Sequence, residues 1–567
     1  MFNILDSLDI NYLSLIFTLI LASLIIYGLI PVIKLFRCGH KHPFPLPFLG
    51  TIIWAYINGI QKCQIDWNRK YGQFYALAQG QTFVLVVSNP NYLKDILVKS
   101  FSNFSNRRFF EMPNKFFRKS LFVIKDEEWS MSRKFILPTF TCHKMKFNMF
   151  PLLSKCASKM VYHLKNSING DLNSIHSNKN CDGKETTIVQ TKDIFGCYAM
   201  DVIASTSFGL DIDSRKENNH AFVRNVRKAF DFDITTPILA LIAIFPFIIP
   251  VLNYFEISFI KEASMQFFAD IVESTIEERK KFNIKRNDYL QLFMDTHDNL
   301  NQSNTNSNNN GCKKNIHKVS DDMLTMKEED SIETKKLEQN LLTTKEEYIS
   351  MALMFFVAGY ESPSNALCWI ARTLAGHPEI QETLRQEIKR KINQKYRSFS
   401  PDLLNYDDIM SLKYMDQVIK EVLRLHPPAI FFDRVASEDY YLEDKLIKKG
   451  TVIEVPVYAL HRDGNIWAFP DKFDPDRFDL KDTTMEDRYC YMPFGMGPRN
   501  CIGSRFAMLE MKVGLTLILG SNIQFVLAPG DINSDLNHDN TKFSNNLINF
   551  PKNGIKVGIR YMENNDL

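Results

Sequence analysis

The residues with the clearest chemical potential lie at 494–503, where the chain reads Phe-Gly-Met-Gly-Pro-Arg-Asn-Cys-Ile-Gly. The glycines permit positive φ and close backbone approach, so a flat macrocycle can lie against this loop. A helix is predicted directly after the loop, and free N–H groups at a helix N-terminus stabilise a thiolate. The sequence therefore indicates that Cys501 ligates a haem iron, where a thiolate favours cleavage of a bound O–O bond. The alternative is a structural cysteine in a glycine-rich turn.

The spacing of this loop makes the haem interpretation specific. Five positions follow the pattern F-x-x-G-x-R-x-C-x-G, which occurs by chance in roughly one chain of this length in several thousand. Arg499 lies within the pattern, and a guanidinium pairs well with a haem propionate. Trp129 and Arg133 are spaced i and i+4, so they share one helix face and can both donate hydrogen bonds to a propionate. Taken singly, each arginine is more often a solvated surface charge.

A second set of reactive groups lies in a long helical pattern from about Lys345 to Gly376. Gly359 in mid-helix costs ~1 kcal/mol relative to alanine. Pro363 has no N–H to donate to the carbonyl of residue 359, so that carbonyl is freed. A free carbonyl beside the Glu361 carboxyl and the Ser362 hydroxyl predicts a proton-relay site. An ordinary core helix is the alternative.

With these motifs in place, the chain resembles the cytochrome P450 family from about Pro43 to about Gly558. It is most similar to the broad-specificity microsomal group that oxidises steroids and drugs. Motifs typical of that group occur at 126–129 (Asp-Glu-Glu-Trp) and 458–463 (Tyr-Ala-Leu-His-Arg-Asp). The resemblance implies a mainly α fold with a smaller β-rich portion, the cytochrome P450 fold, preceded by a single N-terminal transmembrane helix.

The resemblance also assigns roles to individual residues. It implies a haem with Cys501 as the axial ligand and metal-binding residue. It implies propionate contacts from a set that comprises Arg107, Trp129, Arg133, Arg434 and Arg499, in which Arg107 is equally well explained as a surface charge. It gives Glu361 and Ser362 the catalytic handling of oxygen and protons. Most relatives carry threonine in place of Ser362, so coupling of electrons to product is expected to be looser here.

Two further groups follow from the same resemblance. Glu421, Arg424 and Arg477 are expected to lock into a structural triad behind the haem, although an E-x-x-R pair on a helix is usually a surface ion pair of little worth. An apolar substrate pocket is expected, which implies a lipophilic substrate. Core packing is nearly as good an explanation for each of its residues: Phe109, Phe110, Ala358, Ala429, Ile430 and Phe432.

The N-terminal region predicts a membrane anchor. Residues 12–33 carry no charge and would span the ~30 Å hydrocarbon layer as a helix at ~1.5 Å per residue. Lys34, Arg37 and Lys41 follow, so the positive-inside rule places the remainder in the cytosol. A cleaved signal peptide is the alternative, but this sequence has neither the basic start nor the small-residue cleavage site that one requires. A buried core helix is a weaker alternative, because the apolar run is too long. We expect a single-pass protein of the endoplasmic reticulum.

These boundaries define the organisation of the chain. A short luminal N-terminus (1–11) precedes the anchor (12–33). A basic, Pro-rich linker (34–50) then separates it from the haem-thiolate domain (51–567). Two polar stretches, 167–187 and 299–339, are predicted to be disordered insertions. The apolar stretch 234–255 is interrupted by Pro237, Pro246 and Pro250, which excludes a straight spanning helix. Short helices at the membrane surface, roofing the substrate entrance, are expected instead, with ordinary core as the alternative.

Composition fits a large, α-rich, reduced protein. The chain has 567 residues, 45% of them hydrophobic, and a net charge of +3, which is too balanced to suggest nucleic acid. Its ten cysteines are scattered without a C-x-x-C pair, which disfavours zinc and suits a cytosol-facing protein. Cys490 lacks the glycines and arginine that surround Cys501, and is taken as a bystander. Strands are predicted at 72–77 and 83–87.

The sequence thus predicts a monooxygenase that inserts one atom of O2 into a steroid, fatty acid, other lipid or xenobiotic. No flavin or nicotinamide fingerprint is present, so electrons are expected from NADPH through cytochrome P450 reductase, with cytochrome b5 as a further candidate donor. Lys134, Lys144 and Lys146 could form the docking face, or be a generic charged surface. The alternatives are an isomerase or dehydratase acting on a lipid peroxide without a reductase, and a non-catalytic haem sensor. The acid–alcohol pair argues against both.

Overall fold

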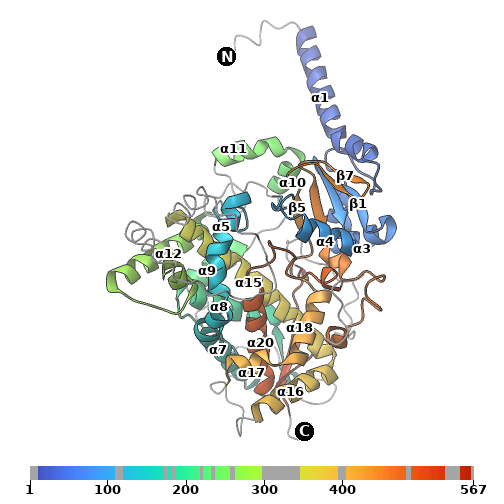
Figure 1. Cartoon of the computed structure of the whole chain (residues 1–567). Coiled ribbons are helices and arrows are strands. Elements are labelled where there is room, and N and C mark those ends of the chain that lie inside the picture. Colours follow the sequence, from blue (N-terminus) through green and yellow to red (C-terminus); the bar gives the residue numbers. More distant parts are fainter. Residues whose placement is uncertain are drawn as a thin grey trace, which may run out of the picture.

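The computed structural model describes residues 10–108, 119–170, 177–179, 185–216, 221–230, 237–255, 262–295, 345–393, 404–479, 487–529 and 549–562. Helices make up most of this part of the chain, and the β structure is confined to short strands (Figure 1). The predicted fold class, mainly α with a smaller β-rich portion, is confirmed.

The helices run from the N-terminal anchor to the segment that follows the cysteine loop. The α-helices are α1 (Ile10–Arg37), α2 (Ile52–Asn58), α3 (Ile60–Tyr71), α4 (Pro90–Lys94), α5 (Asp126–Ile136), α6 (Cys142–Lys144), α7 (Phe150–Ile168), α8 (Thr191–Ile203), α9 (Ala221–Phe230), α10 (Pro237–Ile244), α11 (Ile249–Tyr254), α12 (Glu262–Phe282), α15 (Lys345–Gly376), α16 (Pro378–Asn393), α17 (Tyr406–Met410), α18 (Lys413–Leu425), α19 (Val457–Leu460) and α20 (Ser504–Gly520). Short 3-10 and π turns are η2 (Asp95–Lys99), η3 (Leu137–Phe140), η4 (Met145–Met149), η5 (Ala204–Phe208), η6 (Pro246–Ile248), η8 (Pro475–Phe478) and η9 (Asp487–Tyr489).

The strands form three small sheets. They are β1 (Phe74–Gln79), β2 (Thr82–Val87), β3 (Ser177–Lys179), β4 (Glu185–Gln190), β5 (Phe432–Val435), β6 (Tyr440–Leu442), β7 (Lys445–Ile447), β8 (Val452–Val455), β9 (Ile523–Leu527) and β10 (Lys556–Tyr561). The sheet orders are β1-β2-β8-β5, β3-β4-β10-β9 and β6-β7, and among the described strands only β2 and β8 pair in parallel. The two strands predicted at 72–77 and 83–87 are β1 and β2, which form an antiparallel hairpin.

Helix α15 forms the spine of the body. It crosses the centre of the molecule in Figure 1 and packs against α8, α12, α18 and α20. Its apolar residues, such as Leu367 and Trp369, are buried in the largest core cluster together with residues of α7, α18 and α20. Because α15 packs against so many elements, the position of its middle turns within the body is fixed.

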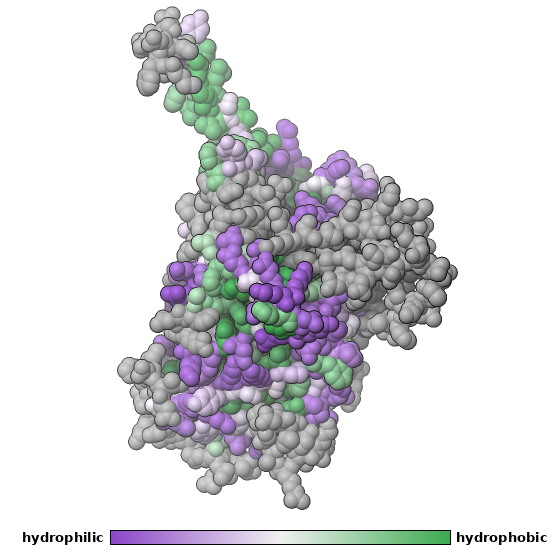
Figure 2. Space-filling model, turned by 90° about the vertical axis from the view of Figure 1, so that its left-hand side faces the viewer, coloured by the Kyte–Doolittle hydropathy of each residue, from purple (hydrophilic) through white to green (hydrophobic). Residues whose placement is uncertain are grey.

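The N-terminal helix α1 stands out from the body. Within Ser14–Arg37, an 18-residue window has a mean hydropathy of 2.6, and only 11% of that window is buried. This is the one helix of the described chain that is long and apolar enough to cross a membrane. Figure 2 shows it as a green column rising clear of the rest. The helix begins before the predicted span of 12–33 and continues to Arg37.

The predicted linker, residues 34–50, is itself in contact with the body. The backbone N–H of Ala76 in β1 donates to Lys41 O at 2.9 Å, and Leu46 pairs with Gly50 in an isolated bridge. The Pro-rich stretch therefore lies along the β1–β2 sheet. The stretch predicted to be interrupted by prolines is broken into α10, η6 and α11. Residues 299–339 lie outside the described residues, as does much of 167–187.

Candidate active site

The loop before α20 is held in a tight turn around Cys501. The Cys501 N–H donates to Phe494 O at 2.8 Å, and the Asn500 N–H donates to Gly497 O at 3.0 Å. Gly495 and Gly497 have φ of 71° and 78°, which side chains rarely tolerate. A Cβ on Gly497 would also collide with the carbonyl oxygen of Leu97. Two glycines of the motif are therefore required by backbone geometry alone.

Cys501 borders an internal space. Its side chain has exposed surface, yet it lies deep enough among protein atoms for burial to raise the pKa of its thiol. The Gly503 N–H, Arg107 and Arg133 act in the opposite direction and lower that pKa. A bound metal cation would add a far larger effect of the same sign, because a coordinating thiol is deprotonated outright. The Cys501 thiol is therefore placed to coordinate a metal from one side.

Arginines converge on this loop from α5 and from the loop itself. Arg133 donates to Asn500 O at 2.9 Å and to Asn500 Oδ1 at 2.6 Å, which ties α5 to the residue before the cysteine. Arg499 donates to Ser105 O at 2.8 Å and to Ile124 O at 2.7 Å. The Trp129 ring lies between them, 4.6 Å from the Arg499 guanidinium carbon and 5.8 Å from that of Arg133.

Two more arginines complete the cluster. Arg107 donates to Arg499 O at 3.1 Å, and Arg434 on β5 is 1% exposed. Burial, followed by Arg107 and Arg499, lowers the pKa of Arg434 well below its usual range. Burial, followed by Arg107 and Arg133, lowers the pKa of Arg499 to about 9, and burial lowers that of Arg133 to about 10. The four guanidiniums are thus crowded, poorly solvated and mutually repulsive.

The cluster has spare hydrogen-bonding capacity for an anion. The Nε atoms of Arg107, Arg434 and Arg499 are buried and have no partner within the described chain. The nearby carboxylate of Asp433 is engaged by Arg108, whose Nε lies 3.3 Å away. Buried donors without acceptors are costly. A group with two carboxylates, such as a haem, would satisfy both the charge and the orphaned donors, so the residues present fit a haem.

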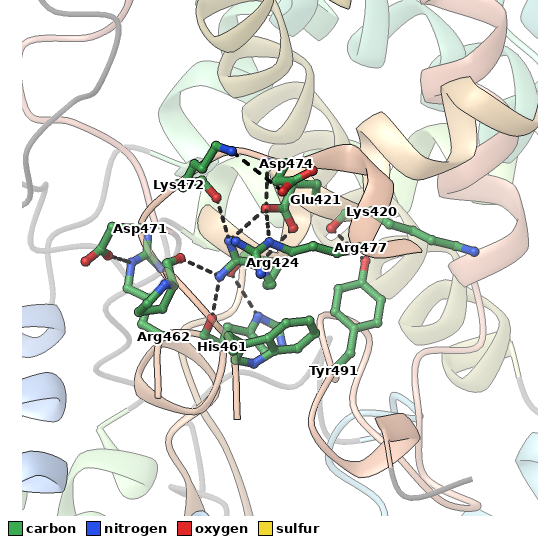
Figure 3. A network of polar contacts seen from close by, with 12 residues as sticks. Lys420, Glu421, Arg424, His461, Arg462, Asp471, Lys472, Asp474, Arg477 and Tyr491 are labelled. Atoms are coloured by element: carbon green, nitrogen blue, oxygen red, sulfur yellow. Dashed lines mark hydrogen bonds and ion pairs between the residues drawn. The ribbon is translucent and has the colours of Figure 1, made fainter. Parts of the chain in front are cut away.

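The predicted triad of Glu421, Arg424 and Arg477 is present (Figure 3). Glu421 on α18 accepts from Arg424 Nε at 2.7 Å and from Arg424 Nη2 at 2.8 Å, and Arg477 Nε lies 3.4 Å from Glu421 Oε1. Arg424 also donates to His461 O and Pro470 O, both at 2.7 Å. Because these carbonyls belong to the chain between β8 and η8, the triad fastens that irregular segment to α18.

His461 connects the triad to the cysteine loop. Its Nε2 accepts from the Met492 N–H at 2.9 Å, so Nδ1 carries the proton and donates to Arg424 O at 3.1 Å. Burial, followed by Arg424, lowers the pKa of His461 to about 3. The imidazole is therefore neutral, and two backbone groups set its tautomer. Through Met492 it holds the segment that leads to Phe494.

Glu361 and Ser362 lie in the middle of α15, as predicted. Ala358 keeps exposed surface although most of the preceding turn is buried. Gly359 is packed against α8, where a Cβ would collide with Ile203 Cδ1. The mid-helix glycine is thus required by helix packing, a reason that the sequence did not reveal.

The Glu361 carboxylate is bound by α8. Lys192 Nζ donates to Glu361 Oε2 at 2.7 Å and also to Ser364 Oγ at 2.8 Å and Asn365 Oδ1 at 2.6 Å. The lysine therefore bridges three positions on one face of α15. Ser362 is half-buried on the same helix. The sequence offered no signal for Lys192, because it lies 169 residues from its partner.

The remaining predicted residues are only partly described. Ala429 is exposed, Ile430 is buried and Phe432 is half-buried on β5, whereas Phe109 and Phe110 lie outside the described residues. Of the predicted docking lysines, Lys134 is exposed on α5, and Lys144 and Lys146 are half-buried beside η4. Lys146 forms an ion pair with Asp407.

The structure thus combines a cysteine loop before a long helix, arginines hydrogen-bonded to that loop, and a buried triad connected to it through His461, which is the arrangement expected of a haem-thiolate enzyme. The chain belongs to the cytochrome P450 family, whose family model matches residues 41–546. It is 35% identical over 485 residues to cytochrome P450 3A13 of Mus musculus, covering 85% of each chain. It is 36% identical over 486 residues to cytochrome P450 3A11 of Mus musculus, covering 85% of this chain and 84% of that one. It is 34% identical over 503 residues to cytochrome P450 3A31 of Mesocricetus auratus, covering 86% and 88%.

Membership in this family establishes the class of activity. The chain is a cytochrome P450 monooxygenase of lipophilic substrates, and its cofactor is a haem with an axial cysteine thiolate. The predicted family, enzyme class and cofactor are confirmed.

Proposed function

We propose that Cys501 is the axial ligand and that the enzyme inserts one atom of O2 into a steroid, fatty acid, other lipid or xenobiotic. The observation that supports this assignment is the convergence of four arginines on the one cysteine loop whose thiol is open to an internal space. When bound, the haem supplies binding and reductive cleavage of O2, which a thiolate ligand favours.

The arginine cluster orients the cofactor in this proposal. Arg107, Arg434 and Arg499 offer their unpaired Nε donors to the propionates, and Arg133 adds its charge beside Asn500. Trp129 stacks with two of these guanidiniums and restricts their rotation. Charge-assisted hydrogen bonds of this kind are roughly twice as strong as neutral ones.

Glu361 and Ser362 move protons to the oxygen site in this proposal. The Ser362 hydroxyl donates a proton toward the oxygen site. The Glu361 carboxyl exchanges protons with solvent, while Lys192 Nζ, 2.7 Å from Glu361 Oε2, holds it in place. Serine lacks the methyl group that restrains a threonine rotamer. We therefore expect Ser362→Thr to raise the yield of product per NADPH and to lower peroxide release. Ser274→Thr, an exposed serine on α12, is the control, and equal yields in Ser362→Thr and wild type would overturn the relay assignment.

We further propose a single-pass protein of the endoplasmic reticulum with its body in the cytosol. Lys34 and Arg37 at the end of α1 support this orientation. Electrons then come from NADPH through cytochrome P450 reductase, with cytochrome b5 as a second donor. The exposed Lys134 on α5 supports docking of an acidic partner on the cysteine side of the molecule. Turnover that does not depend on NADPH and reductase would instead identify an isomerase or dehydratase.

The ligand assignment is tested by the carbon monoxide difference spectrum of the reduced protein. Cys501→Ser is expected to abolish the long-wavelength Soret band that marks thiolate ligation. Cys490→Ser is the matched control, because Cys490 is buried only 11 residues earlier and has no part in the loop. A Soret band that survives in Cys501→Ser would refute the assignment, and a band lost in Cys490→Ser would move it to that residue.

A further inference from the structure

A groove lies on the surface of the body beside the end of α1. It has a volume of about 370 Å³, and its walls come from the chain that follows α1, the start of β1, α4 and the first residue of β7. In Figure 1, α3, α4, β1 and β7 lie together below the lower end of α1. Neither the haem site nor the proton relay uses any residue of this groove.

The formally charged side chains that line the groove are basic. Lys41 is exposed and forms no ion pair with the described residues, and its backbone is fixed because the Ala76 N–H donates to Lys41 O at 2.9 Å. Lys445 Nζ lies 5.9 Å from the centre of the Phe74 ring and 5.6 Å from that of the Tyr92 ring. No carboxylate is present among the described residues that line the groove. The groove therefore has a net positive charge.

The acidic residues of the β6–β7 turn compensate this charge only weakly. Glu443 is exposed and accepts from the Tyr92 hydroxyl at 2.7 Å. Asp444 lies 2.6 Å from Lys445 Nζ, but its side chain is 83% exposed. An exposed ion pair of this kind contributes little. A ligand with a higher charge and more acceptor atoms can therefore take the place of Asp444 at Lys445.

His40 adds a neutral donor on the opposite side of Phe74 in the chain order of the groove. Its ring meets the edge of the Phe74 ring, with centroids 5.1 Å apart and planes at 71°. Burial, followed by Lys445, lowers the pKa of His40. The imidazole is therefore neutral at pH 7 and offers one N–H, which an anion accepts without first displacing a proton.

The floor of the groove is already formed in the absence of a ligand. The Asn89 side-chain amide donates to Gln73 Oε1 at 3.1 Å, and Gln73 Nε2 donates to Asp463 Oδ2 at 3.0 Å. Asn68 on α3 donates to the same carboxylate oxygen at 3.4 Å. Because these side chains are held by one another, little ordering is needed when a ligand binds, which favours affinity.

The groove lies close to the expected level of the lipid headgroups. The apolar run of α1 ends at Ile33 and the helix continues to Arg37, which is ~6 Å further at ~1.5 Å per residue. The headgroup layer extends ~5–7 Å beyond each edge of the hydrocarbon core. The groove begins two residues after Arg37, at Gly39. Basic residues next to the cytoplasmic end of a spanning helix attract anionic lipids.

We propose that this groove binds a phosphate monoester, with Lys41, Lys445 and His40 as its donors. A monoester carries nearly two negative charges and three acceptor oxygens, which matches donors that come from separate segments of the chain. The location of the groove favours the headgroup of a membrane lipid, such as phosphatidic acid, and a soluble phosphate ester has the same chemistry. The lipid source rests on α1 crossing the membrane, as proposed above, whereas recognition of the phosphate does not.

The test uses the full, haem-loaded chain in phosphatidylcholine vesicles. Titration calorimetry with glycerol 3-phosphate measures binding of a soluble monoester. Native mass spectrometry of protein from vesicles that also contain phosphatidic acid counts the retained lipid. Lys41→Gln and Lys445→Gln are each expected to weaken binding about fivefold, the contribution of one basic residue near a membrane surface. Lys34→Gln and Lys448→Gln are the matched controls, because each removes the same charge nearby from a residue that does not line the groove.

The outcomes separate the site, its ligand source and the anchor. Retention of phosphatidic acid without binding of glycerol 3-phosphate identifies the lipid as the ligand, and binding of both identifies the phosphate group itself. Wild-type protein that binds neither overturns the proposal. Equal losses in Lys34→Gln and Lys41→Gln also overturn it, because the attraction is then general to the basic surface. Alkaline carbonate extraction tests the anchor separately, and release of the wild-type chain would remove the lipid source while the glycerol 3-phosphate titration still decides the site.

Discussion

Replacing Glu421 by glutamine tests the energetic reasoning behind the triad. The carboxylate is 0% exposed and accepts from Arg424 Nε at 2.7 Å, from Arg424 Nη2 at 2.8 Å and from the Asp474 N–H at 3.0 Å. Glutamine preserves the volume but removes the charge and turns an NH2 group toward these donors. Arg424 then remains buried with only carbonyl oxygens as acceptors, among them His461 O and Pro470 O.

The expected loss follows from burial. Removing one partner of a fully buried ion pair costs ~3–5 kcal/mol, because the other charge is left uncompensated. A typical domain is stable by only ~5–15 kcal/mol, so Glu421→Gln removes a large fraction of the total. The segment between β8 and η8 depends on the same arginine, and we expect it to open first.

The assay is the free energy of unfolding in urea, followed by circular dichroism of the haem-loaded protein. Glu128→Gln is the matched control, because Glu128 pairs with Lys119 at 2.7 Å but its side chain is 41% exposed. An exposed pair contributes ~0–1 kcal/mol. If Glu421→Gln costs no more than Glu128→Gln, the triad does not carry a buried, uncompensated charge and the reasoning is refuted.

Two further predictions concern the same core. The pKa of His461 is lowered from 6.5 to about 3 by burial and by Arg424, so below pH 6.5 the unfolded chain binds a proton that the folded chain does not. The stability linked to His461 is complete above about pH 6.5 and falls by ~1.4 kcal/mol per pH unit toward pH 3. The free energy of unfolding in urea, measured from about pH 7 to about pH 5, should depend less on pH in His461→Gln than in wild type. An unchanged pH dependence would contradict this. Overpacking of Gly359→Ala against Ile203 Cδ1 should cost ~1–3 kcal/mol, of which the better helix propensity of alanine offsets ~1 kcal/mol. Ile203→Val should relieve the overpacking and make the double variant more stable than Gly359→Ala. A Gly359→Ala variant that is ~1 kcal/mol more stable than wild type would show that α8 moves aside.

Local patterns in the sequence predicted the elements that hold the site. The helix predicted from about Lys345 to Gly376 is α15, with the same bounds. The helix expected after Cys501 is α20, which begins at Ser504. These predictions succeed because helical periodicity and the glycine positions of the cysteine loop are set by neighbouring residues. The roles of Glu361 and Ser362 remain predictions.

The contacts that sequence could not predict are those between distant segments. Lys192 on α8 binds Glu361, and Tyr27 on α1 binds Ile244, and neither pair leaves a trace in local spacing. Arg133 was predicted to face a propionate, but its bond to Asn500 depends on how α5 crosses the cysteine loop. Such pairings depend on how whole elements pack together. The local sequence around one lysine or tyrosine on a helix does not distinguish it from others of the same type.

The crowding of the four arginines affects the stability of the haem-free protein. Guanidiniums that repel one another, with only partial compensation from Asp433 and Asp126, make the haem-free chain less stable than its core alone would allow. A ligand that binds only the folded state stabilises it by ~4 kcal/mol at a thousandfold excess over its dissociation constant. The cofactor thus acts as a missing structural counter-ion. We therefore expect haem-free chains to unfold more often than haem-loaded ones and to be more exposed to proteolysis when haem is scarce.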